Sequence, residues 1–187
     1  MRIKLLLLDF DGTLASTERA NTEAYIEALA EQGIELSEEE YRAKYFGMRC
    51  PEFMTAIGIT DPTLAEHVRR RKIEIYPSHF DSVHLNRPLW DFALDFRKQG
   101  GKVWVVSTGH PDNLLNAMNY LGITGDVDGI LSSEDIERPK PAPDAFIKAM
   151  LTEGVTPAET LIFEDSEVGL QAAEASGAAY FKVSLPY

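Results

Sequence analysis

The fold is decided by the stretch LLLLDFDGT, residues 5–13. The mainly apolar segment Ile3–Leu8 is too short for a helix and is typical of a strand buried on both faces. Strands of this kind belong to parallel sheets covered by helices. Two carboxylates, Asp9 and Asp11, follow the strand at its carboxyl end, which is where ligands bind in such sheets. The stretch therefore predicts both a sheet and the edge at which to look for chemistry.

Downstream of this stretch, short apolar segments alternate with segments of helical pattern. The predicted strands are Lys102–Val106, Gly129–Leu131, Leu161–Phe163 and Ala179–Val183. The predicted helices, each followed by a glycine, are Pro88–Gln99, Asn113–Leu121, Pro143–Glu153 and Glu167–Ser176. This alternation predicts an α/β fold with a doubly wound, Rossmann-like parallel sheet.

The alternation is interrupted between the first strand and the second. Residues 16–86 contain helical patterns such as Glu18–Gln32, a capping box of Ser37 with Glu40, and a helix start at Asp61-Pro62. We expect no strand in this part. The predicted organisation is a core domain of residues 1–15 and 87–187 with an inserted helical cap domain of residues 16–86.

Polar residues follow the later strands as well. Ser107 and Thr108 precede a helix, where a hydroxyl and free backbone N–H groups can hold an anion. Lys140 is placed between prolines, which restrict its backbone and suit a fixed ammonium group beside a phosphoryl group. Glu164 and Asp165 follow the fourth predicted strand.

Each of these features has a simpler interpretation in isolation, such as a polar turn, a helix cap or a surface lysine. Taken together, they bring four carboxylates to one sheet edge, where they would repel one another without a cation. Mg²⁺ favours a site of a few carboxylates, water and substrate oxygens. The sequence thus predicts a magnesium site next to an anion site.

Four motifs occur in the order LLLLDFDGT, VWVVSTG, PKPAPDAF and LIFEDSEVGLQAA. With these motifs the chain resembles the haloacid dehalogenase superfamily. Within it, the chain is similar to the small sugar-phosphate phosphatases and β-phosphoglucomutase-like enzymes, which carry a helical cap after the first motif. The resemblance implies a phosphoric monoester hydrolase acting on a small phosphorylated metabolite.

The resemblance also implies a role for each motif residue. Asp9 would be the nucleophile that forms an aspartyl-phosphate, and Asp11 the general acid and base. Ser107 and the Thr108 amide would bind phosphoryl oxygens, and Lys140 would neutralise charge. Mg²⁺ would be held by Asp9, the Asp11 carbonyl and Asp165, with Glu164 bound directly or through water.

Other functions within and outside the superfamily are less compatible with the residues. Dehalogenases lack the second aspartate, which is Asp11 here, and phosphonatases need a cap lysine where this chain has Arg49. β-Phosphoglucomutase is the main alternative, but its cap histidine corresponds to Asn21. A receiver domain is disfavoured by the helical insertion of residues 16–86 after the first strand. A non-catalytic phosphate-binding module is disfavoured because the polar residues of all four motifs are present.

The cap is expected to select the substrate. Arg49 lies in the apolar loop Phe46–Arg49 and could bind a second anionic or hydroxylated part of the substrate, although pairing with Glu52 is the simpler interpretation. The sequence does not indicate an oligomeric state, and a monomer is plausible.

Composition limits the partners. The 187 residues carry a formal net charge of −12, and the cationic run Arg69–Lys72 occurs in a helix-like stretch with acidic neighbours, so we expect a solvated helix face and no nucleic-acid partner. No apolar run reaches the ~20 residues of a membrane span. We expect a cytoplasmic protein without a membrane partner.

Cys50 has no second cysteine with which to form a disulfide.

Overall fold

The computed structural model describes residues 2–185. The chain divides into two compact units, which we describe separately. The core unit comprises the residues up to Ser16 and those from His84 onward, and the helical unit comprises Thr17–Val83.

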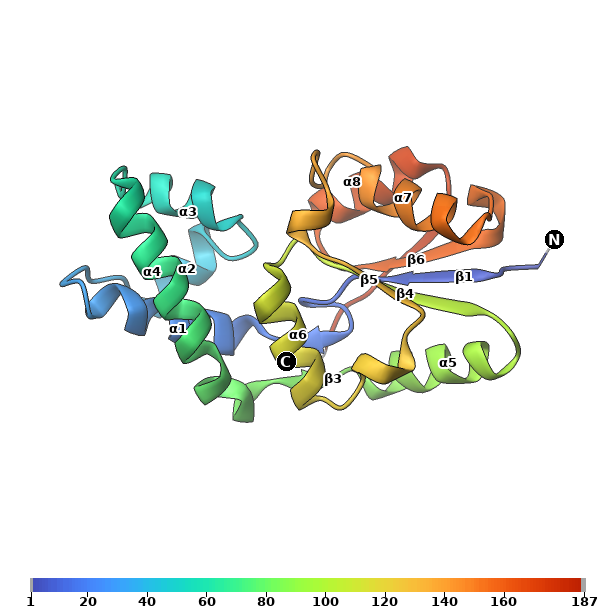
Figure 1. Ribbon diagram of the computed structural model, residues 1–187, viewed down its shortest axis with the longest axis horizontal. Helices are drawn as coiled ribbons and strands as arrows, with labels where there is room; N and C mark the ends of the chain where they lie inside the picture. Colours follow the sequence, from blue (N-terminus) through green and yellow to red (C-terminus); the bar gives the residue numbers. More distant parts are fainter. Residues whose placement is uncertain (1, 186–187) are drawn as a thin grey trace. The chain divides into compact units, whose positions relative to one another are not determined.

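The core unit is built on a parallel sheet with the strand order β5-β4-β1-β6-β7 (Figure 1). The strands are β1 (Leu5–Leu8), β4 (Lys102–Val106), β5 (Gly129–Leu131), β6 (Thr160–Glu164) and β7 (Ala179–Lys182). Between them run α5 (Arg87–Lys98), α6 (Pro111–Tyr120), α7 (Asp144–Glu153) and α8 (Glu167–Ser176), with short 3₁₀ turns at Thr124–Asp126, Ser133–Asp135 and Pro157–Glu159. The predicted doubly wound α/β fold is confirmed.

The central strand β1 explains why the sequence folds this way. All four of its leucines are fully buried, as expected for a strand covered on both faces. One face packs against α7 and α8 in a cluster that includes Leu5, Leu7 and Phe146, while α5 lies on the other side of the sheet (Figure 1). Burial of this apolar area is the main force that holds the sheet and helices together.

The strand register places the strand ends side by side. Leu8 lies opposite Val105 of β4 and Phe163 of β6. The chain therefore leaves β1 at Asp9 level with the ends of both neighbouring strands. The order of the strands reverses around β1, and ligands bind at such switch points in open α/β sheets.

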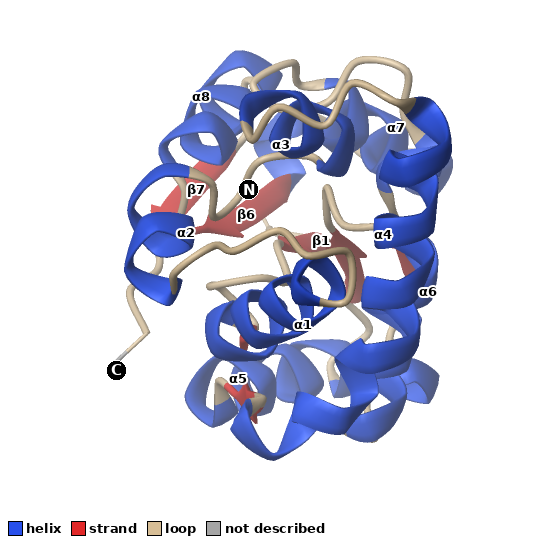
Figure 2. Ribbon diagram, turned by 90° about the vertical axis from the view of Figure 1, so that its left-hand side faces the viewer, coloured by secondary structure: helices blue, strands red, loops and turns tan. Residues whose placement is uncertain are grey.

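The helical unit contains α1 (Glu18–Ala30), α2 (Glu38–Lys44), α3 (Cys50–Ala56), α4 (Pro62–Ile75) and a 3₁₀ turn at Tyr76–Ser82 (Figure 2). The predicted helix starts are present: Ser37 accepts a hydrogen bond from the Glu40 amide, and Asp61 accepts one from the Thr63 amide. Helix α1 packs along α4, and its buried positions include Ala20, Ala24 and Ala28.

Two predictions for residues 16–86 were wrong. Strands β2 (Ala15–Ser16) and β3 (His84–Leu85) form a short antiparallel ladder where the chain leaves and re-enters the core unit. Two residues carry no alternating pattern, so only the meeting of distant segments creates these strands. In addition, Lys72 is only 2% exposed, although we expected the run Arg69–Lys72 to form a solvated face.

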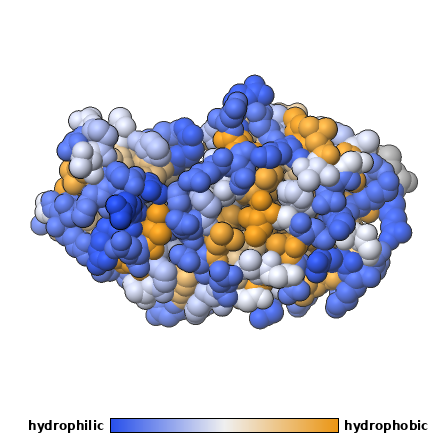
Figure 3. Space-filling model, in the orientation of Figure 1, coloured by the Kyte–Doolittle hydropathy of each residue, from blue (hydrophilic) through white to orange (hydrophobic). Residues whose placement is uncertain are grey.

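No helix within residues 2–185 is long and apolar enough to cross a membrane. The face drawn in Figure 3 carries mainly hydrophilic side chains, interrupted by smaller apolar areas.

Candidate active site

A buried ammonium group lies at the carboxyl end of the sheet. The Lys140 side chain is only 3% exposed, and its Nζ donates hydrogen bonds to Asp9 Oδ1 at 2.6 Å and to Glu164 Oε1 at 2.5 Å. These three residues come from the loops after β1 and β5 and from the last position of β6. The geometry thus brings the first, third and fourth motifs into direct contact.

The Glu164 carboxylate is held on both of its oxygens. While Oε1 faces Lys140, Oε2 accepts hydrogen bonds from the Ser166 amide at 2.8 Å and from the Ser166 hydroxyl at 3.0 Å. Gly169 of α8 makes room for it, since a Cβ there would lie 1.9 Å from Glu164 Oε1. Helix α8 therefore begins directly against this carboxylate.

Asp165 is fixed by the loop after β1. Its Oδ1 accepts a hydrogen bond from the Thr13 hydroxyl at 2.9 Å. Gly12, with a φ of +91°, is close to the other oxygen, because a Cβ at this position would be 2.3 Å from Asp165 Oδ2. Glycine is required here both for the left-handed backbone and for the space.

Asp11 and Ser107 form a second polar pair. The Ser107 hydroxyl donates to Asp11 Oδ2 at 3.3 Å and accepts from the Gly109 amide at 2.9 Å. Thr108, the predicted amide donor to phosphate, lies half-buried in the same loop. Asp11 and Ser107 belong to the first and second motifs, so residues of all four predicted motifs lie at this edge.

Three carboxylates converge closely enough for one cation. Ligand oxygens of Asp9, Glu164 and Asp165 all lie within 4.8 Å of one another. Such an all-oxygen donor set fits Mg²⁺. The Asp11 carboxylate accepts a hydrogen bond from Ser107 and is not one of these three groups, and the predicted contribution of Asp11 to the metal site is through its backbone carbonyl.

The electrostatics of the group favour a bound cation. Burial raises the pKa of Asp9 well above its ordinary value; Lys140 opposes this rise, whereas Glu164 and Asp165 add to it. Burial also raises the pKa of Asp165, against the hydrogen bond from Thr13. Burial disfavours the Lys140 ammonium, but Asp9 and Glu164 outweigh this effect and raise the pKa of Lys140. Three acids share this ammonium, and a divalent ion would offset the remaining negative charge.

The predicted cap residue Arg49 belongs to the helical unit. It precedes α3, is exposed, and pairs with Glu52, to which its Nε donates at 2.9 Å. This is the simpler of the two arrangements expected from the sequence. A role in substrate binding stays a prediction.

Several residues that shape the site were not predicted from the sequence. Thr13, Ser166 and Gly169 hold or accommodate the acidic side chains, and Asn86 binds the loop after β1. Thr13 and Ser166 lie within the quoted motifs, next to the acidic residues, and this proximity in the sequence could have indicated their role. Asn86 lies about seventy residues further along the chain from the loop that it contacts, and no local pattern indicates that contact.

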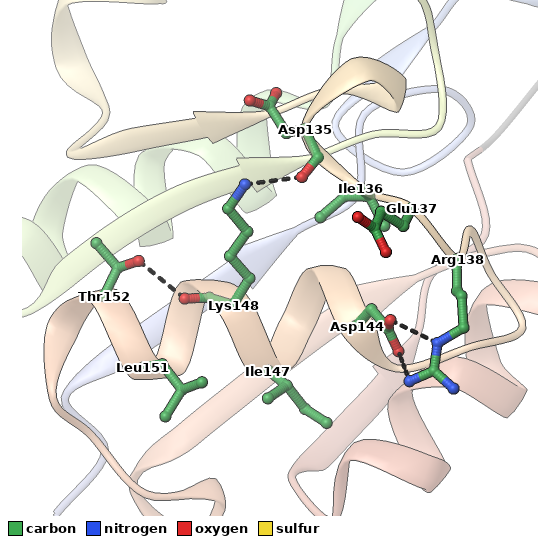
Figure 4. Close-up of a pocket in the computed structure, with 9 residues that line it drawn as sticks. All are labelled: Asp135, Ile136, Glu137, Arg138, Asp144, Ile147, Lys148, Leu151 and Thr152. Carbon is green, nitrogen blue, oxygen red and sulfur yellow. Dashed lines mark hydrogen bonds and ion pairs between the residues drawn. The ribbon is translucent and has the colours of Figure 1, made fainter.

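A separate groove of about 670 Å³ lies on the core unit, between residues 135–138 and helix α7 (Figure 4). Ile147 and Leu151 line its helix side, and the ion pair of Arg138 with Asp144 lies at one end. None of the predicted site residues lines this groove. Arg138 is paired with Asp144, the Lys148 ammonium donates to the Asp135 backbone carbonyl, and the Asp135 carboxylate accepts from Ser132. These polar groups are therefore not directed together into the groove as in a catalytic site.

The chain is similar to known proteins over most of its length. Residues 6–183 match the family described as haloacid dehalogenase-like hydrolase. Protein CbbY of Rhodobacter capsulatus is 30% identical over 95% of this chain and 83% of its own length. Fructose-1-phosphate phosphatase YqaB of Escherichia coli is 29% identical over 92% of each chain. The crystal structure of CbbY from Rhodobacter sphaeroides in complex with phosphate has a TM-score of 0.85 and 25% identity, covering 95% of this chain and 84% of that one.

Proposed function

Because this chain belongs to the haloacid dehalogenase-like hydrolase family, we propose that it is a Mg²⁺-dependent phosphatase in which Asp9 attacks a small phosphorylated metabolite. The observation that carries the proposal is the group of Asp9, Glu164 and the half-buried Asp165 around the Lys140 ammonium. A carboxylate is a poor nucleophile toward an anionic phosphate unless nearby positive charge offsets the repulsion. The site offers one fixed ammonium and a set of ligands for a further cation.

The reaction would proceed in two displacements. In the first, an oxygen of Asp9 bonds to phosphorus, the bond from phosphorus to the leaving oxygen breaks, and Asp11 gives that oxygen a proton. In the second, water attacks the phosphorus of the aspartyl-phosphate, Asp11 takes a proton from the water, and the bond to Asp9 breaks with release of phosphate. Dividing hydrolysis in this way replaces one difficult step by two easier ones.

The surrounding residues would bind and orient the phosphoryl group. Ser107 is close enough to Asp11 to place a phosphoryl oxygen beside the acid, with the Thr108 amide as a second donor. Lys140 would stay protonated and offset negative charge on Asp9 and the phosphoryl group. Mg²⁺, held by Asp9, Asp165 and Glu164 with the Asp11 carbonyl, would supply further charge neutralisation and orientation when bound.

A sugar phosphate is the substrate class that we favour. YqaB, whose name gives fructose 1-phosphate as its substrate, aligns with this chain over nearly the whole of both sequences. We propose that the helical unit Thr17–Val83 is the cap that was predicted over residues 16–86, and that its side chains, Arg49 among them, select the sugar.

Phosphotransfer within a sugar phosphate, as in β-phosphoglucomutase, is the alternative, and Asn21 disfavours it. Asn21 Nδ2 donates to the Thr17 carbonyl at 3.1 Å, and its Oδ1 accepts from Lys72 Nζ at 2.7 Å. An amide side chain does not titrate near neutral pH, so it cannot act as a general acid or base as a histidine can. A phosphatase would release inorganic phosphate, whereas a mutase would convert a sugar phosphate into an isomer without net release.

The direct test is phosphate release from a generic aryl phosphate, with Mg²⁺ and with chelator, followed by a panel of phosphorylated metabolites. We expect turnover only with the divalent ion and the highest kcat/KM on a sugar phosphate. Full activity in chelator would contradict the metal assignment. Absence of phosphate release from every substrate would contradict the phosphatase proposal.

A further inference from the structure

The hydroxyl of Thr13 is directed at a candidate metal ligand. Thr13 is fully buried, and its Oγ1 donates to Asp165 Oδ1 at 2.9 Å. Gly12 leaves just enough room for Oδ2 on the other side. The carboxylate is therefore confined from two directions by consecutive residues of the loop after β1.

The same loop is anchored by Asn86, which follows β3 where the chain re-enters the core unit. Asn86 Nδ2 donates to the Thr13 carbonyl at 3.0 Å, and the Asn86 amide donates to the Leu14 carbonyl at 2.8 Å. At the same time, Asn86 Oδ1 caps α5 by accepting from the Leu89 amide at 3.3 Å. One side chain thus joins the start of α5 to the loop that holds Asp165.

We propose that Thr13 and Asn86 are positioning residues for the metal site: Asn86 holds the Thr13 backbone, and Thr13 orients the Asp165 carboxylate toward the cation. The inference rests on the proposed function, since it assumes that Asp165 is a ligand. Hydrogen-bond partners of ligating side chains typically contribute 10–100-fold to metal affinity. The arrangement also links metal affinity to the segment through which the chain returns from the helical unit.

Thr160 provides a matched control for Thr13. It is also fully buried in the core unit and donates its hydroxyl to a backbone carbonyl, that of Thr156, at 3.0 Å. Both threonines lose one buried hydrogen bond when replaced by valine, at similar volume. Only Thr13 bonds a carboxylate of the acidic cluster, so only its replacement should change metal binding.

The experiment is Mg²⁺ binding by isothermal titration calorimetry to the wild type and to Thr13→Val, Thr13→Ser, Asn86→Ser and Thr160→Val, with circular dichroism and thermal melts for each. We expect Thr13→Val to raise the Kd for Mg²⁺ about tenfold and Thr13→Ser to restore it to within about threefold. Asn86→Ser keeps an acceptor for the cap of α5 but loses the amide donor, and should raise the Kd about threefold. Thr160→Val should lower the Tm and leave the Kd unchanged.

The outcomes separate this inference from the proposed function. If the wild type binds Mg²⁺ and a folded Thr13→Val variant binds it equally well, the positioning role is wrong while the metal site stands. An equal rise in Kd for Thr160→Val would also overturn it, since the effect would then be general loosening. If Thr13→Val does not fold, the Asn86→Ser variant decides. An unchanged Kd for Mg²⁺ in Asn86→Ser overturns the positioning role, and a raised Kd supports it. If the wild type binds no Mg²⁺, the proposed function fails, and the inference fails with it.

Discussion

Lys140 and Lys72 are both buried, one in each unit, but different chemistry surrounds them. Lys140 lies between the carboxylates of Asp9 and Glu164. Lys72 donates to Asn21 Oδ1 at 2.7 Å, and its Nζ lies 3.9 Å from the centre of the Tyr76 ring. The core unit thus holds its ammonium group with charged partners, whereas these contacts in the helical unit are an amide dipole and an aromatic face.

The difference separates chemistry from stability. Three carboxylates, those of Asp9, Glu164 and Asp165, lie around the single Lys140 ammonium, so the group has excess negative charge that can bind a cation. The two contacts of Lys72 named above, an amide oxygen and an aromatic face, carry no formal charge of their own. We therefore expect changes near Lys140 to alter turnover, and changes at Lys72 to alter mainly the stability of the helical unit.

The largest expected effect is that of Asp9→Asn, which removes the anion that Lys140 faces. The amide has nearly the same shape but cannot attack phosphorus, so activity should fall below about a hundredth of wild type with the fold retained. Phosphate release and circular dichroism would measure both. Activity above that level in a folded variant would place the nucleophile elsewhere.

Paired substitutions of the two lysines test the comparison itself. Lys140→Met should lower kcat/KM on an aryl phosphate by about a hundredfold or more, because the reacting charges lose their fixed cation. Lys72→Met should keep that activity within about threefold, while the loss of its hydrogen bond to Asn21 lowers the Tm. Equal losses of activity in two folded variants would remove the distinction between the units.

The acids around Lys140 should differ in their share of metal binding. Glu164 is already engaged by Lys140 and Ser166, whereas Asp165 is held through one oxygen by Thr13. We expect Asp165→Ala to raise the Kd for Mg²⁺ by about a hundredfold and Glu164→Ala by about tenfold, measured by calorimetry. The reverse order would show that Glu164 is the stronger ligand.

The smallest effect concerns Arg49 of the helical unit. Arg49→Ala should raise the KM for the natural substrate about tenfold, the scale of one charge-assisted contact, and leave hydrolysis of a small aryl phosphate unchanged. Glu52→Ala is the control, because it removes the partner of Arg49 but keeps the guanidinium. No loss with either substrate would restrict Arg49 to its ion pair with Glu52.

The fold, the family and the enzyme class were predictable from the sequence, and these predictions are confirmed. These features were predictable because their signals are short segments of sequence. A run of four leucines followed by acidic residues indicates both a buried central strand and the edge of the sheet at which ligands bind. Ser107 and Asp165 directly follow strands, Glu164 ends a strand, and Lys140 lies in the long loop after β5, so their places in the sequence indicated the same edge of the sheet. Their catalytic roles stay predictions.

What the sequence could not predict depends on contacts between distant segments. The β2–β3 ladder and the hydrogen bond of Asn86 to Thr13 join residues about seventy positions apart, and neither leaves a periodic pattern. Lys72 continues a run of three arginines and resembles an exposed residue until α1 and α4 pack together. Burial of a polar side chain is decided by its partners, which composition alone does not identify.

The central claim is that Asp9 carries the phosphoryl group during turnover. Trypsin should release Asp9 in a peptide that ends at Arg19, so acid-quenched enzyme can be mapped by mass spectrometry after reaction with an aryl phosphate and Mg²⁺. We predict one added phosphoryl group on Asp9, more abundant in Asp11→Asn because the second step has lost its base, and absent in Asp9→Asn. Steady phosphate release by wild type and Asp11→Asn with no phosphoryl group on this peptide, or with the group on another residue, would contradict the account.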